Sequence, residues 1–122
     1  MGSMNERNLV AISIKHSNYY INQGKWKFGM PCVLWGERRT ADDEKRTYSG
    51  YTIYLDNAEL YSLEDWANSS YSGCNWMKID APVKMSPDLM KKYRGCDTVL
   101  MLIDDYRKYC EMACLPTKGG CW

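Results

Sequence analysis

The sequence has little of what most catalytic sites need. His16 is the only histidine among the 122 residues. No P-loop, GxGxxG or HExxH motif is present, and no serine or cysteine lies in a recognisable nucleophile motif. A histidine-dependent nucleophile would have to use His16, for which a structural or surface role is the stronger interpretation. We therefore expect a protein that is not an enzyme and uses no cofactor.

The chain also lacks an excess of charge and any long apolar run. Its formal charge is +1, from 16 basic and 15 acidic residues, which argues against non-specific binding of nucleic acid. No apolar run approaches the roughly 18 to 20 residues that cross a bilayer. The first residues show no basic and then apolar secretion signal, and Gly2 and Ser3 are typical of a cloning remnant before a native Met4. We expect a cytoplasmic protein with no membrane partner, built as one domain over residues 4–122.

Cysteine is not scarce, since the chain has six. Without a secretion signal we expect reduced thiols rather than disulfides. Three thiols near the C-terminus, with Cys96 or His16, have the right chemistry for zinc, but their spacing departs from the usual paired CxxC motifs. We therefore expect no metal. The six are Cys32, Cys74, Cys96, Cys110, Cys114 and Cys121.

Phenylalanine is almost absent, because Phe28 stands alone beside ten tyrosines and five tryptophans. Most of the aromatic surface therefore carries a polar group suited to half-buried or interface positions. This composition makes a homo-oligomer, such as a dimer, our expectation.

The first half of the chain favours an antiparallel sheet. Residues Leu9–Lys15 alternate in the manner of a half-buried strand, and Cys32–Trp35 favours a second strand. The polar, glycine-containing segment Ser17–Gly29 between them favours a loop or hairpin connection over a helix. Two β-prone runs, Tyr51–Leu55 and Glu59–Ser62, are separated by three turn-forming residues, which predicts a hairpin.

The second half changes to helical periodicity. Ser62 followed by Asp65 is typical of a capping box at the start of a short helix. Ser86 and Pro87 predict the N-cap and first position of a second helix, which Gly95 would terminate. The pattern therefore predicts two helices with locally encoded starts.

The last part combines a strand with a helix. The apolar run Thr98–Ile103 is typical of a strand covered on both faces, at the centre of the sheet. Asp104 and Asp105 follow it; metal ligands and general bases occur at such a place, but an N-cap role for Asp105 is the favoured interpretation. A helix should follow and end at Pro116, with a buried stripe of Tyr106, Tyr109, Cys110, Ala113 and Cys114. We predict an α+β fold, with an antiparallel or mixed β-sheet and two or three helices packed mainly on one face.

The connection Leu34–Thr52 is the strongest candidate for a binding site. Arginine supplies planar donors for phosphate, and Trp and Tyr supply flat faces for stacking. Acidic residues are interleaved, so a self-neutralised solvated loop is the alternative interpretation. The flanking aromatic residues favour a ligand-binding site, whose residues would be Trp35, Arg38, Arg39, Arg46, Tyr48 and Tyr51.

The order of LWG, a charged connection, SGYT, a short ELY strand and a Trp-bearing helix resembles small proteins encoded by phages and prophages. The resemblance covers roughly Val10 to Ala67. It implies a protein that acts in the cytoplasm of a bacterial host against host defence. One such activity is to sequester a nucleotide-like immune signal, as cyclic ADP-ribose sponges do; the alternative is to block a host defence protein by direct contact, as anti-CRISPR proteins do.

Overall fold

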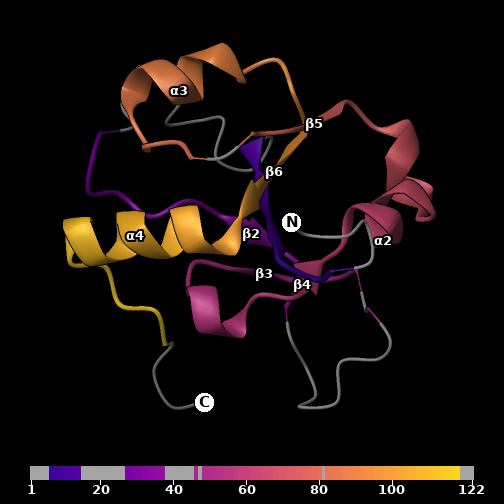
Figure 1. Cartoon of the computed structure of the whole chain (residues 1–122), viewed down its shortest axis with the longest axis horizontal. Helices are drawn as coiled ribbons and strands as arrows, with labels where there is room; N and C mark the ends of the chain where they lie inside the picture. The colour runs from indigo at the N-terminus through magenta and orange to yellow at the C-terminus, as the bar shows by residue number, and fades with distance from the viewer. Residues whose placement is uncertain (1–5, 15–26, 38–45, 47, 81, 119–122) are drawn as a thin grey trace.

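The computed structural model describes residues 6–14, 27–37, 46, 48–80 and 82–118 (Figure 1). Within them, a mixed, mostly antiparallel sheet of six strands packs against three α-helices, so the predicted α+β fold is confirmed. The strands are β1 (Leu9–Ser13), β2 (Leu34–Trp35), β3 (Tyr51–Thr52), β4 (Leu60–Tyr61), β5 (Trp76–Lys78) and β6 (Thr98–Leu102). The helices are α2 (Leu63–Ala67), α3 (Pro87–Lys92) and α4 (Ile103–Ala113), with short 3-10 turns η1 (Leu55–Asn57) and η2 (Ser70–Gly73).

The sheet is ordered β3-β2-β1-β6-β5, and β4 pairs with the first residues of β1. The β5 and β6 pair is parallel, and the other pairs are antiparallel. The apolar strand β6 lies between β1 and β5, as its composition predicted, although β1 takes the middle place. No helix in the described part of the chain is both long and apolar enough to span a bilayer.

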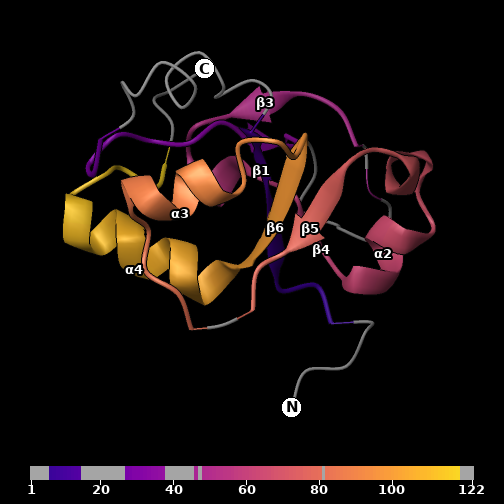
Figure 2. The ribbon, with the colours of Figure 1, turned by 90° about the horizontal axis from the view of Figure 1, so that it is seen from above.

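Helices cover both faces of the sheet (Figure 2). On one face, Met90 of α3 and Tyr106 of α4 belong to the larger core cluster, together with Val10 of β1. On the other face, Trp66 of α2 packs with Leu9 of β1. Two of the three helices therefore share a face, in agreement with the expectation, and the third faces a second core.

The prediction that β1 is half-buried is wrong, because all five of its residues are buried. Its alternation is real, since Val10 and Ile12 enter the α3 and α4 core while Leu9 and Ala11 enter the α2 core. A strand covered on both faces keeps its period of two, and small or apolar residues then occupy the second face.

The predicted hairpin between Tyr51–Leu55 and Glu59–Ser62 is also wrong. β3 pairs with β2 and β4 pairs with β1, so the two strands are not partners. The connection instead forms η1, in which Leu55 is buried and the N–H of Asp56 donates to the carbonyl of Thr117, at 2.8 Å. Burial of Leu55 and this distant hydrogen bond direct the chain away from a tight turn.

The locally encoded helix starts are confirmed. The Oγ of Ser62 accepts from the N–H of Asp65, and the Oδ2 of Asp65 accepts from the N–H of Ser62, each at 2.9 Å. The Oγ of Ser86 accepts from the N–H of Leu89 at 3.1 Å. Such caps depend on residues three positions apart, which is why the sequence alone reveals them.

The start of α4 differs from expectation. The helix begins at Ile103 with Leu102 as N-cap, so the N-cap role predicted for Asp105 is wrong. Strand β6 runs straight into α4, and the N–H of Ile103 donates to the carbonyl of Asn8 at 2.8 Å. A backbone acceptor thus replaces the side-chain cap, and Asp105 lies buried within the first turn.

Candidate functional site

Aromatic side chains on the α2 face of the sheet form an unbroken series of ring contacts. Ring centroids lie 4.8 Å apart for Trp35 and Tyr51, and 5.4 Å apart for Trp35 and Tyr71. Tyr48 stacks on Tyr61 at 5.1 Å and on Tyr71 at 5.8 Å. We call this group the aromatic cluster; its members are Trp35, Tyr48, Tyr51, Tyr61, Trp66, Tyr71 and Trp76.

Strand register places the two outer rings. Trp35 is the cross-strand partner of Tyr51 on one side and of Ala11 on the other. Cross-strand partners project to the same face of a sheet. Because Ala11 is small, the indole of Trp35 has room to lie over β1. The pairing therefore aims both rings toward α2 and η2.

Tyr48 is held in a left-handed backbone conformation, with φ of 50°. Its N–H donates to Glu59 Oε1 at 3.0 Å, and its hydroxyl donates to the carbonyl of Asp65 at 2.9 Å. The hydroxyl of Tyr71 in turn donates to the carbonyl of Tyr48 at 3.3 Å. Such a conformation costs about 1–2 kcal/mol outside glycine. These contacts hold the ring in the cluster despite that cost.

The buried carboxylate of Glu59 accepts hydrogen bonds from two members of the aromatic cluster, Tyr48 and Tyr61. Glu59 is 3% exposed, and its Oε1 also accepts from the hydroxyl of Tyr61 at 3.0 Å. Burial, followed by the charge and hydrogen bond of Glu59, raises the pKa of Tyr61 far above its ordinary value, so the phenol stays protonated. A Cβ on Gly36 would lie 2.0 Å from that phenol oxygen, so only glycine fits there.

The structure describes the three predicted aromatic residues and one of the three predicted arginines. Trp35, Tyr48 and Tyr51 come together in the aromatic cluster. Arg46 is only 9% exposed, and its Nη1 donates to the carbonyl of Leu60 at 2.9 Å, so it braces the backbone of β4. Arg38 and Arg39 lie outside the described residues.

A small pocket opens at the edge of the cluster, where β1 ends and β6 begins. Its volume is about 140 Å³. An apolar cavity of about 150 Å³ takes up benzene, so this space suits one aromatic ring. We call it the aromatic pocket; its lining residues are Ser13, Trp35, Tyr51, Trp66, Tyr71, Cys74, Asp97 and Thr98.

Two tryptophans that line the aromatic pocket have indole N–H groups that make no hydrogen bond within the described structure. The Nε1 atoms of Trp35 and Trp66 are both buried without a partner. By contrast, Nε1 of Trp76 donates to the carbonyl of Ser72 at 3.1 Å. A buried unsatisfied donor costs about 1–3 kcal/mol, so native structures keep few of them. Both atoms are fully enclosed, so an acceptor on a ligand could meet them only if a side chain turns.

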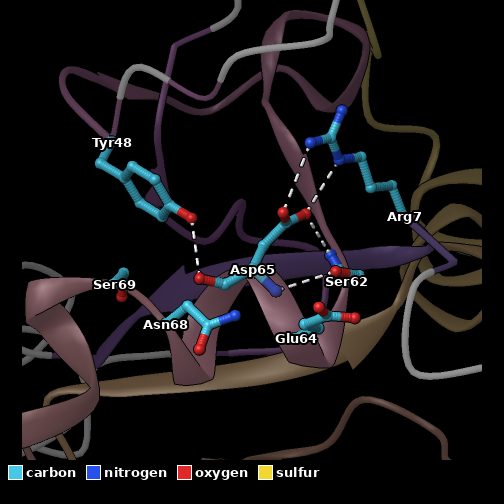
Figure 3. Close-up of a pocket in the computed structure, with 7 residues that line it drawn as sticks. All are labelled: Arg7, Tyr48, Ser62, Glu64, Asp65, Asn68 and Ser69. Carbon is cyan, nitrogen blue, oxygen red and sulfur yellow. Dashed lines mark hydrogen bonds and ion pairs between the residues drawn. The ribbon is translucent and has the colours of Figure 1, made fainter.

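A second hollow, of about 550 Å³, lies beside α2 (Figure 3). Two of its charged groups pair with each other: Arg7 Nε lies 2.9 Å from Asp65 Oδ2, and Ser62 completes the capping box with Asp65. Burial alone would raise the pKa of Asp65, but hydrogen bonds from Arg7 and Ser62 outweigh it and lower that pKa below 3.8. We therefore interpret this hollow as a wide surface basin over a helix cap rather than as the ligand site.

The Asp65 network predicts a pH dependence. A lowered pKa in the folded state stabilises the fold above the unfolded pKa of about 3.9, and this contribution is lost as the pH falls through the folded value. Asp65→Asn should therefore lower the free energy of unfolding by about 1 kcal/mol at pH 7. The variant should also lose less of that free energy than the parent when the pH is lowered from 7 to below 4. Urea unfolding at both pH values measures this. The exposed neighbour Glu64 gives the control Glu64→Gln, and equal behaviour of both variants would contradict the prediction.

The described residues contain no group of three or more His, Cys, Asp or Glu side chains arranged for a metal. His16 and Cys121, which entered the zinc alternative, lie outside those residues. Cys110 is buried as expected, but Cys114 is exposed, so its predicted place in the buried stripe is wrong. The reason is that α4 ends at Ala113 and Cys114 adopts a left-handed C-cap, which turns it away from the core.

Thiol labelling should follow this burial pattern. Cys74 and Cys114 are exposed and should react with maleimide in the native protein. Cys32 and Cys110 should react only after denaturation, and burial also raises the pKa of Cys110, which lowers its thiolate fraction. Peptide mapping by mass spectrometry reads out each site. Rapid native labelling of Cys110, or protection of Cys114, would contradict the structure.

Comparison with known proteins gives no relative: no family matches the chain, and neither curated proteins nor solved structures contain a significant match.

Proposed function

We propose that this protein is a non-catalytic binding protein that holds a nucleotide-like ligand by its base in the aromatic pocket. The observation that supports this most is the pocket itself, a ring-sized space lined by the aromatic side chains of Trp35, Tyr51 and Tyr71. Base stacking on aromatic side chains contributes about 1–3 kcal/mol per base. From the sequence resemblance to phage proteins, we propose that its biological role is to sequester a host immune signal in the bacterial cytoplasm.

The pocket is too small for a whole nucleotide, since ligand pockets usually measure about 300–1,000 Å³. The sugar and phosphates would therefore lie outside it. None of the described residues that line it is basic, so phosphate must be met elsewhere. Arg38 and Arg39 follow Glu37 directly, and the N–H of Glu37 pairs with the carbonyl of Ser49 at 2.8 Å near Tyr51. We propose these two arginines, without Arg46, as the phosphate contacts.

A protein-interaction role is the second candidate. Tyr51 and Ile53 are each 43% exposed at β3, the end of the strand order. Exposed aromatic and aliphatic groups at a sheet edge suit contact with another protein, such as a host defence effector. The homo-oligomer expected from the aromatic composition stays a prediction that light scattering can test.

Thermal melting with a panel of nucleotides separates the two candidates. A ligand that binds only the folded form raises the melting temperature, whereas a missing protein partner leaves it unchanged. A rise that saturates with one or more nucleotides supports the ligand-binding proposal. No rise with any nucleotide would overturn it in favour of the interaction role.

Replacing Tyr51 with alanine should weaken binding of the responding nucleotide by about 1–3 kcal/mol, or about 5- to 150-fold, because a stacking wall is lost. Isothermal calorimetry measures the change. Phe28 is the matched control, since it is 48% exposed but packs against Tyr109 on the opposite face. Phe28→Ala should bind like the parent, and equal losses in both variants would refute the assignment of the site.

A further inference from the structure

Asp97 is the acidic residue among the described residues that line the aromatic pocket. Asp97 lies immediately before β6, and its N–H donates to the carbonyl of Asn75 at 2.7 Å, which fixes its backbone. It is half-buried and lines the pocket. Within the described structure, its carboxylate takes part in no hydrogen bond or ion pair. A carboxylate of this kind is available to a ligand.

The negative charge of Asp97 determines which end of a nucleotide can enter the pocket. An ionised carboxylate only accepts hydrogen bonds, and it repels phosphate. The group that enters the pocket must therefore be flat, to meet Trp35, Tyr51 and Tyr71, and must present N–H donors toward Asp97. The hydrogen-bonding edge and one ring of the base then lie inside and the phosphates lie outside, as the absence of a basic residue from the described lining also requires.

The bases differ in the donors that they offer. Guanine presents N1–H and the N2 amino group side by side, which matches the two oxygens of one carboxylate, and its neighbouring O6 is an acceptor. Adenine and cytosine each place one amino group beside an acceptor nitrogen, which a carboxylate repels. Among these bases, guanine therefore matches the Asp97 carboxylate best.

We infer that the aromatic pocket selects a guanine base, with the Asp97 carboxylate accepting from N1–H and N2. This inference rests on the proposed nucleotide-binding function and names its ligand class. Asp97 is then a specificity-determining residue that contacts the ligand directly.

The test compares GMP, IMP and AMP on the intact protein by calorimetry. IMP keeps O6 and N1–H but lacks the N2 amino group, so it removes one hydrogen bond to the carboxylate. We expect GMP to bind about tenfold or more tightly than IMP, because hydrogen bonds to charged groups are the strong ones, and AMP to bind more weakly still.

The variant Asp97→Asn should reduce the preference for GMP over IMP to about threefold or less, since an amide offers one acceptor and a competing donor. Asp80→Asn is the control, because the side chain of Asp80 is 98% exposed and lies outside the pocket. It should leave all three affinities unchanged.

Each outcome is decisive. Equal binding of the three nucleotides, or preference for AMP, overturns the guanine inference while the nucleotide-binding proposal stands. An unchanged GMP preference in Asp97→Asn overturns the role of Asp97. Failure of every nucleotide to bind removes the proposed function as well. The comparison of nucleotides on the parent protein stands even if the variant folds poorly.

Discussion

Replacing Trp66 with alanine should lower the free energy of unfolding by about 3–5 kcal/mol, the usual cost of deleting a large buried aromatic side chain. Trp66 is 1% exposed, and its ring lies 5.5 Å from that of Tyr61 and 6.1 Å from that of Tyr71. It is the main anchor of the short helix α2, which five residues alone could not stabilise. Urea unfolding followed by far-ultraviolet circular dichroism measures the loss.

Trp66→Phe separates packing from hydrogen bonding. Because Nε1 of Trp66 has no partner in the described structure, loss of the N–H itself should not destabilise the fold, and the cost should stay below that of the alanine variant. A phenylalanine variant as unstable as the alanine variant would show that the indole N–H has a structural partner.

Replacing Gly36 with alanine should cost about 2–5 kcal/mol. Gly36 has φ of 91°, where a side chain adds about 1–2 kcal/mol of strain. The new methyl group would also overlap the hydroxyl of Tyr61, 2.0 Å away, which adds about 1–3 kcal/mol of overpacking. The same overlap should push Tyr61 against Tyr48 and disturb the aromatic cluster. Chemical denaturation gives the total.

Two further variants divide that total into strain and overlap. Gly29 has φ of 103°, and no described atom lies within 4 Å of the place that a methyl group would take, so Gly29→Ala should show the strain alone. Adding Tyr61→Phe to Gly36→Ala removes the overlapping oxygen, and the double variant should recover part of the loss relative to the sum of the singles. If Gly29→Ala and Gly36→Ala cost the same, the close approach of Tyr61 is not present in solution.

The sequence predicted best where structure depends on near neighbours. The capping pair Ser62 and Asp65 and the cap at Ser86 were recognisable, because three-residue spacing determines them. The hairpin over Tyr51–Ser62 failed because its strands choose distant partners, β2 and β1, over each other. The composition of a turn does not indicate which of several strands a neighbouring strand will pair with. The full burial of β1 was missed for a related reason, since α2 comes from a part of the chain far along the sequence.

The candidate site shows the same limit. Trp35, Tyr48 and Tyr51 were recognised because they flank one connection. Tyr61 and Trp66 are expected in a strand and a helix, and Tyr71 falls in none of the predicted elements, so only the folded chain brings these three into one cluster with Trp35. The excess of Tyr and Trp over Phe indicates that many aromatic side chains are half-buried, but it does not show which of them pack together. The burial of Arg46 was equally hidden, since a charged residue in a polar segment is expected to be exposed.

The most direct test of the aromatic pocket is a nucleotide titration that follows the indole N–H signals by NMR. We predict that GMP shifts the signals of Trp35 and Trp66 in a saturable manner, because both side chains line the pocket and a bound base changes their surroundings. The signal of Trp76, whose N–H already donates to Ser72, should move least among these three. Unchanged Trp35 and Trp66 signals at saturating nucleotide would contradict the central claim.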